Sequence, residues 1–231
     1  MYTKVYHMFK KLLIPLFCIV YSPLLVSAID NDTENKRFLW QSTLCESIFK
    51  HHVRLLKNTR VAHKPLVVCF SGVPGMGKTH IAKILEEKFS GVRISNDEIR
   101  TIIKNFASPL GAQWLMQAYL MYFMLSYSAP NKFIILDSSI DRRYAVLLPY
   151  LKVKGIPSIV VRLETPYEQV VERLTAREHA GDGVYLKFLD SWYADYDTCG
   201  QCCPVTIVVK NDKNAPLVLD KLFALIGQYL A

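Results

Sequence analysis

The stretch GVPGMGKT at residues 72–79 decides the fold of this chain. It fits the pattern G-x-x-x-x-G-K-[ST], the P-loop, in which glycines let backbone N–H groups close around the phosphates of a nucleotide. The lysine of the pattern, Lys78, would reach the outer phosphates, and the hydroxyl of Thr79 can bind Mg²⁺. The sequence therefore predicts a nucleotide site formed by Gly72, Gly75, Met76, Gly77, Lys78 and Thr79.

The residues on either side of this stretch favour a P-loop over a chance glycine-rich turn. Residues 66–70 (LVVCF) are continuously apolar, which is typical of a strand buried in a parallel sheet. Residues 81–85 (IAKIL) continue with helical spacing, and the positive N-terminal end of such a helix would face the phosphates. Strand, loop and helix therefore follow in the order that phosphate binding requires.

The rest of the chain alternates apolar runs with helical patterns. Strands separated by helices predict an α/β protein of the P-loop NTPase fold, with a five-stranded parallel sheet covered by helices on both faces. Ligands of such sheets bind beyond the carboxyl ends of the strands. The runs expected to form strands are residues 66–70, 92–95, 133–136, 158–163 and 205–209.

One uncharged stretch, residues 112–128, invites a second interpretation as a membrane span. It is shorter than the roughly 20 residues that a spanning helix needs, and Pro109 and Pro130 bound it. We therefore expect a buried helix that covers the sheet.

The N-terminal region has the layout of a secretory signal peptide. Three lysines precede an apolar stretch, which ends in the small residues Val26-Ser27-Ala28. The stretch is also long enough for a membrane anchor. We expect residues 1–28 to be a signal peptide or anchor that makes transient contact with membrane or secretion machinery, and residues 29–64 to form a helical extension. The chain would then be secreted or membrane-anchored; the alternative is a cytoplasmic location, where nucleoside triphosphate is supplied.

Two candidate site residues, Asp97 and Arg100, follow the second predicted strand, in the stretch ISNDEIR at residues 94–100. Asp97 begins a helix at the strand end, where a carboxylate facing the P-loop can accept a proton from a hydroxyl nucleophile. Alternatively, Asp97 only caps the helix. Arg100 lies one turn further on the same face and could hold a polar or anionic acceptor.

The third predicted strand ends in an aspartate. Residues 133–137 (FIILD) combine four apolar residues with Asp137, which is suited to Mg²⁺ or its water shell. Ser138 and Arg142 follow closely and could contact the acceptor, although Arg142 and Arg143 could equally be surface charges.

Two arginines share one face of the helix predicted to begin at Tyr167. Arg173 and Arg177 are spaced i, i+4 and precede the glycine-containing loop 180–183. A mobile lid of this kind would bring positive charge onto a transferring phosphoryl group and exclude water. The alternative is an exposed helix face, with Glu168 and Glu172 as partners.

Taken in order, GVPGMGKT, ISNDEIR, IILDSS and RLTAR resemble the motifs of P-loop kinases of the polynucleotide kinase and zeta toxin group. The resemblance covers residues 65–200 and is nearest to the 5′-hydroxyl polynucleotide kinase domain of phage type. It implies a P-loop kinase domain over residues 65–231. It also implies that Asp97 is the general base, that Arg100 contacts the acceptor, and that Arg177 stabilises the transferring phosphoryl group, with Arg173 nearby.

The sequence thus predicts a monomeric, ATP-dependent kinase that uses Mg²⁺ and transfers the γ-phosphoryl group to a hydroxyl. Candidate acceptors are a nucleic-acid 5′-hydroxyl, a nucleotide sugar or another small polyol. The resemblance does not select one of these, because Asn96 stands where the polynucleotide kinases carry arginine. The net charge of +8 is too small by itself to argue for nucleic-acid binding.

The alternative to a kinase is a nucleotide-binding module or effector with little or no phosphotransfer. The expected roles are catalytic for Lys78, Asp97 and Arg177, nucleotide-binding for the P-loop and Arg173, acceptor-binding for Arg100, Ser138 and Arg142, and metal-binding for Thr79 and Asp137.

Overall fold

The computed structural model describes residues 62, 64–104, 121, 124, 125, 128, 132–181, 185–214 and 217–231. All of them belong to one compact unit, Ser47–Ala231. The expected signal peptide or anchor lies outside the described residues, as does the helical extension apart from Ala62 and Lys64. Within the described ranges, no helix combines the length and the apolar character needed to cross a membrane.

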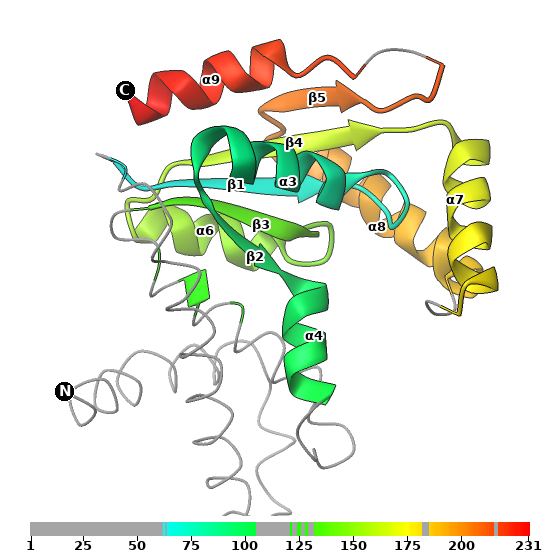
Figure 1. The fold of residues 1–231 in the computed structure, drawn as a ribbon. Helices are drawn as coiled ribbons and strands as arrows, with labels where there is room; N and C mark the ends of the chain where they lie inside the picture. Colours follow the sequence, from blue (N-terminus) through cyan, green and yellow to red (C-terminus); the bar gives the residue numbers. More distant parts are fainter. Residues whose placement is uncertain are drawn as a thin grey trace, which may run out of the picture. The chain divides into compact units, whose positions relative to one another are not determined.

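The centre of the fold is a parallel sheet of five strands in the order β2-β3-β1-β4-β5 (Figure 1). The predicted parallel sheet is therefore confirmed, with β1 at its centre. Every residue of β1 is buried, as its continuous apolar run requires. The strands are β1 (Leu66–Ser71), β2 (Val92–Ser95), β3 (Phe133–Ser139), β4 (Ser158–Glu164) and β5 (Ile207–Lys210).

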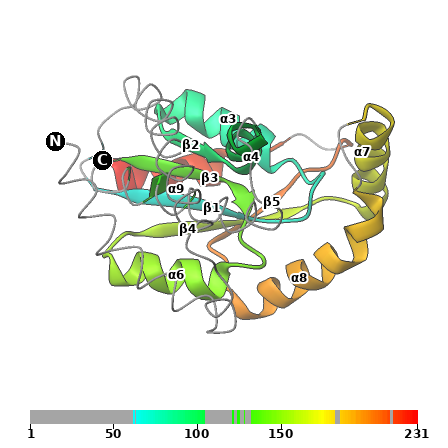
Figure 2. The ribbon, with the colours of Figure 1, turned by 90° about the horizontal axis from the view of Figure 1, so that it is seen from below.

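Helices cover the sheet on both sides. Figure 2 shows α3 on one side and α6 and α8 on the other, while α7 stands beyond the carboxyl ends of the strands in Figure 1. The rings of Phe89 on α3 and Phe223 on α9 meet edge to face, 5.9 Å apart. The helices are α3 (Lys78–Phe89), α4 (Asn96–Lys104), α6 (Tyr144–Val153), α7 (Tyr167–His179), α8 (Leu189–Cys202) and α9 (Asp220–Leu230), with a 3₁₀ turn, η3 (Leu186–Phe188), before α8.

Four residues of the uncharged stretch 112–128 are described. Met121, Met124, Leu125 and Ser128 are helical and buried. Their spacing of three, four and seven places them on one helix face, as expected of a helix that packs on the protein. The other residues of the stretch lie outside the described part of the chain.

The third strand is longer than its sequence indicates. The apolar run predicts an end at Asp137, but β3 continues to Ser139. The pairing with β1 accounts for the added length: Cys69 pairs with Leu136 and the next residue, Phe70, pairs with Ser139, so that β3 carries two extra residues at this irregularity. Asp137 consequently lies within the strand and not at its tip.

Gly91 offers a test of how closely the sheet is packed. A Cβ atom at Gly91 would lie 2.5 Å from the ring of Phe133, which is itself buried on β3. We expect Gly91→Ala to lower the free energy of unfolding by about 1–3 kcal/mol, because the overpacked ring cannot move freely. Equilibrium unfolding in urea measures this loss.

The matched control for this experiment is Gly227→Ala on α9. A Cβ atom there meets nothing within 4 Å, so alanine should leave stability unchanged or raise it by about 0.5–1 kcal/mol through helix propensity. Equal effects of the two substitutions would contradict the packing argument.

Candidate nucleotide and phosphotransfer site

The P-loop turns between the end of β1 and the start of α3. Gly75 and Gly77 have φ angles of 88° and 98°, in the left-handed region that favours glycine. At Gly77 a side chain is excluded a second time, because a Cβ atom would lie 2.2 Å from Nδ2 of Asn211. The loop therefore brings bare backbone to the N-terminus of α3, where an anion is stabilised by the helix dipole.

Lys78 is folded back onto this loop. Its Nζ atom donates to the carbonyl oxygens of Gly72 and Val73, each at 2.8 Å. Burial lowers the pKa of the ammonium group to about 8, against the opposing effect of the carboxylates of Asp141 and Asp137. The lysine is thus charged at neutral pH and lies directly beside the phosphate cradle.

Asp141 supports the loop from the segment after β3. The backbone N–H of Gly72 donates to its Oδ2 atom at 3.0 Å, and the side chain is buried. The other carboxylate oxygen, Oδ1, has no hydrogen-bond partner within the described ranges. The sequence did not single out Asp141, because an aspartate beside two arginines looks like part of a surface turn.

Three further side chains hold the backbone carbonyls of the loop. Thr165 and Asn211 both donate to the carbonyl oxygen of Met76, at 3.3 Å and 2.7 Å. Arg173 donates to the carbonyl oxygen of Gly75 at 2.9 Å. Arg173 thus reaches the P-loop from α7, as the lid interpretation expects, but its guanidinium binds the loop backbone itself. Neither Thr165 nor Asn211 carries a sequence signal for this role.

Arg177, the second arginine of α7, is exposed. Burial is the main cause of the lowered pKa of Lys78, and the positive charge of Arg177 lowers it further. The side chain of Arg177 is thus accessible on the helix that also carries Arg173.

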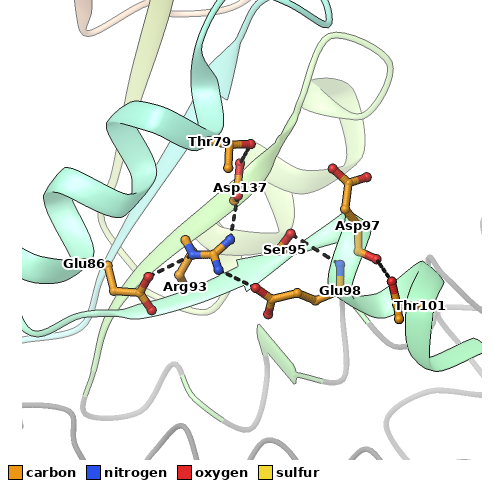
Figure 3. A network of polar contacts seen from close by, with 8 residues as sticks. All are labelled: Thr79, Glu86, Arg93, Ser95, Asp97, Glu98, Thr101 and Asp137. Carbon is orange, nitrogen blue, oxygen red and sulfur yellow. Dashed lines mark hydrogen bonds and ion pairs between the residues drawn. The ribbon is translucent and has the colours of Figure 1, made fainter. Parts of the chain in front are cut away.

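Thr79 and Asp137 form the expected pair. The Thr79 hydroxyl donates to Oδ1 of Asp137 at 2.9 Å, and the aspartate side chain is only 3% exposed (Figure 3). In the described part of the chain, no group of three or more His, Cys, Asp or Glu could hold a metal by itself. The pair nevertheless fits Mg²⁺, which prefers oxygen ligands and is bound through one or two protein groups, waters and substrate phosphates.

A residue that the sequence analysis missed holds the other side of Asp137. Nη1 of Arg93 on β2 donates to Oδ2 of Asp137 at 2.7 Å (Figure 3). An arginine inside a short apolar strand is a sequence signal in itself, because such a cation must be paired when it is buried.

Asp97 and Arg100 lie together on α4. Nη1 of Arg100 donates to Oδ1 of Asp97 at 2.7 Å, and both side chains are exposed, by 50% and 79% respectively. At the N-terminus of α4, the hydroxyl oxygen of Ser95 accepts a hydrogen bond from the backbone N–H of Glu98 at 3.5 Å. Asp97 is therefore an accessible carboxylate, in the first turn of the helix that follows the carboxyl end of β2.

The other two residues predicted to bind the phosphoryl acceptor, Arg142 and Ser138, contact other side chains of the protein. Arg142 forms an ion pair with Asp195 and donates to the hydroxyl of Ser191 at 3.1 Å, both on α8. Ser138 is buried, with its hydroxyl 4.0 Å from the sulfur of Met121. Of the predicted site residues, hydrogen bonds thus join Lys78 and Arg173 to the P-loop backbone and Thr79 to Asp137. Asp97 and Arg177 are exposed on α4 and α7.

The lowered pKa of Lys78 generates a testable pH dependence. Protonated Lys78 attracts phosphates, so affinity for ADP should fall as pH rises through about 8, becoming about tenfold weaker at pH 9 than at pH 7. Calorimetric titration of ADP without metal measures this change. Lys78→Met should bind ADP more weakly and without the step near pH 8; equal pH dependence in both chains would contradict the assignment.

Comparison with known proteins places this geometry in a family. The AAA domain family matches residues 67–196, from the first strand through most of α8. No curated protein matches the chain. A structure from the PezAT toxin–antitoxin system of Streptococcus pneumoniae is similar, with 14% identity, a TM-score of 0.55, and 82% of this chain and 87% of that chain covered.

A second similar structure is a Chloroflexus aurantiacus protein named “putative kinase”. It is 14% identical with a TM-score of 0.51, and the comparison covers 73% of this chain and 100% of that chain. Similarity at this level of identity concerns the fold, and it confirms the resemblance to P-loop kinases of the zeta toxin group at that level. Because the family match spans more than half of the 231 residues, from β1 and the P-loop to α8, the chain belongs to the AAA domain family of P-loop proteins.

Proposed function

We propose that this protein is a kinase that transfers the γ-phosphoryl group of ATP to a hydroxyl acceptor. The observation that carries the proposal is Asp97, an accessible carboxylate in the first turn of α4, directly beyond the carboxyl end of β2 and at the same edge of the parallel sheet as the P-loop. A nucleotide switch or binding module needs the P-loop but has no use for a base opposite it. The similarity in fold to a protein named as a kinase adds support.

In the proposed reaction the acceptor oxygen attacks the γ-phosphorus in line with the leaving group. A new bond forms between that oxygen and phosphorus, and the bond from phosphorus to the β–γ bridging oxygen breaks, which releases ADP. The hydroxyl proton passes to the carboxylate of Asp97. Most of the catalysis comes from positioning and charge neutralisation, which suits a site built from fixed cations and a base.

The P-loop cations bind and orient ATP. Lys78 would leave the carbonyl oxygens of Gly72 and Val73 to bind the β- and γ-phosphates, which are stronger acceptors. Arg173 already holds the loop at Gly75, and Arg177 stands exposed on the same helix, one turn further. Arg177 is therefore the cation that can still turn onto the transferring group.

Thr79 and Asp137 would hold Mg²⁺ through their oxygen atoms. When it is bound, the ion neutralises the charge that develops on the phosphates. Because Asp137 is buried and its Oδ1 atom already faces the Thr79 hydroxyl, these oxygens need little rearrangement to serve the metal.

The acceptor belongs to one of three classes: a nucleic-acid 5′-hydroxyl, a nucleotide sugar or another small polyol. The arginines expected to meet the acceptor, Arg100 and Arg142, are each paired with a carboxylate. Both ion pairs are exposed, so they are weak and an anionic acceptor could exchange them at small cost.

The direct test is phosphotransfer by the full chain. It is incubated with ATP labelled in the γ-phosphate, with Mg²⁺, and with a panel of the three acceptor classes. Labelled product supports the kinase, whereas tight ATP binding without transfer to any acceptor supports the nucleotide-binding module.

The role of Asp97 is tested by Asp97→Asn. The amide keeps the size of the side chain but cannot take the proton, so kcat should fall by about 10²- to 10⁴-fold while KM for ATP changes little. Steady-state kinetics with the best acceptor measures both constants. Glu87→Gln, a neutralised exposed carboxylate on α3, is the matched control and should retain activity. Full transfer by the Asp97→Asn chain would remove the general base from the proposal.

A further inference from the structure

Arg93 is a partly buried cation that the proposed reaction does not use. It lies in β2, and its side chain is only 12% exposed. Its guanidinium contacts a carboxylate from each of three different elements (Figure 3). Nε donates to Glu86 on α3 at 2.9 Å, Nη1 donates to Asp137 on β3 at 2.7 Å, and Nη2 donates to Glu98 on α4.

The three carboxylates are not equivalent. Glu86 and Glu98 are 38% and 42% exposed, whereas Asp137 is 3% exposed. Exposed ion pairs contribute little, because water competes for both charges. A buried carboxylate needs its partner, since removing that partner leaves an uncompensated buried charge and is strongly destabilising. The contact between Arg93 and Asp137 is therefore the one with the largest energetic consequence.

That contact determines the direction of the second carboxylate oxygen. Oδ2 of Asp137 accepts from Arg93, and Oδ1 accepts from the hydroxyl of Thr79 at 2.9 Å. A carboxylate held at one oxygen by a short charged hydrogen bond has little freedom to rotate. Arg93 thus keeps Oδ1 directed at Thr79, the residue proposed to bind the metal.

The guanidinium is itself held in place from the opposite side. Glu86 and Glu98 bind Nε and Nη2, so the plane of the group is fixed by three points. Burial alone would lower the pKa of Arg93, but the hydrogen bonds from its carboxylate partners outweigh burial and raise it. Three carboxylates against one guanidinium leave a net negative charge, so the cluster still attracts a metal ion.

From this geometry we infer that Arg93 is a positioning residue for the metal site: by clamping Oδ2 of Asp137 it orients the carboxylate and sets the affinity for Mg²⁺ with nucleotide. This inference rests on the proposed function, because it assumes that Mg²⁺ and nucleotide bind at the P-loop. Partners of this kind, one step removed from the metal, commonly change metal affinity by about 10- to 100-fold when they are replaced.

Arg93→Lys is the informative substitution. Lysine keeps the positive charge but lacks the planar fork, so it cannot reach Glu86, Glu98 and Asp137 in one plane. If Arg93 served only to neutralise charge, lysine would replace it without effect on the metal. Arg93→Gln, which can offer Asp137 one uncharged donor, is a second variant. Circular dichroism shows which of the two variants folds, and a folded variant is enough to test whether Arg93 positions Asp137.

The experiment measures binding of a fluorescent ADP analogue to the full chain, with EDTA and over a range of Mg²⁺ concentrations. In EDTA the wild type and Arg93→Lys should bind the analogue equally well, within about twofold. The Mg²⁺ concentration that gives half of the metal-dependent change should rise by about 10- to 100-fold in the variant. An unchanged Mg²⁺ midpoint would overturn the inference.

Two further variants distinguish a role of Arg93 in positioning Asp137 from a role in stabilising the fold. In an Asp137→Asn background, Arg93→Lys should add less than about a twofold change, because the effect is transmitted through Asp137. Glu86→Gln, the matched control, removes the charge of one partner of Arg93 but leaves the contact to Asp137, and should leave the Mg²⁺ midpoint within about threefold. An equally large effect of Arg93→Lys in the Asp137→Asn chain would contradict the inference.

The wild-type chain distinguishes this inference from the proposed function. If it binds no nucleotide, the proposed function fails and the role of Arg93 fails with it. If it binds nucleotide and Arg93→Lys responds to Mg²⁺ as the wild type does, only the role of Arg93 is wrong.

Discussion

The structure depends on how the backbone of the P-loop is held. A loop that offers bare N–H and C=O groups at the edge of an apolar sheet needs partners for them, because unpaired buried backbone groups are costly. Here side chains supply those partners. Asp141 accepts from Gly72, Asn211 and Thr165 donate to Met76, and Arg173 donates to Gly75. The segments after β3, β4 and β5 and the helix α7 therefore all converge on one short loop.

The charged side chains around this loop also interact with one another. Lys78 lies among carboxylates and close to Arg177, and it remains protonated at neutral pH despite burial. On the other side of α3, Arg93 joins Asp137 to the first turn of α4, the helix that carries Asp97. The residue proposed to support the metal and the helix that presents the proposed base are thus tied to the same guanidinium.

Much of the fold is predictable from local pattern. The apolar run of β1, the glycines of the P-loop and the helical spacing of α3 are contiguous in sequence, and the structure places all three as expected. The end of β3 is different, because its length depends on the register shift in its pairing with β1, where Cys69 pairs with Leu136 and Phe70 with Ser139. The partners of Arg142 were likewise not predictable: Asp195 and Ser191, which it contacts on α8, lie about 50 positions further along the chain.

What the sequence determined by itself was the order of strand, phosphate loop and helix, and the identity of Lys78, Thr79, Asp97 and Asp137 as candidates. Those signals are local, because glycine conformation and side-chain periodicity act over a few residues. Only the tertiary structure showed which side chains support them. Asn211 lies 135 positions from Met76, and Arg93 lies 44 positions from Asp137. Contacts at such separations arise when the strands pair, and no short stretch of sequence encodes them.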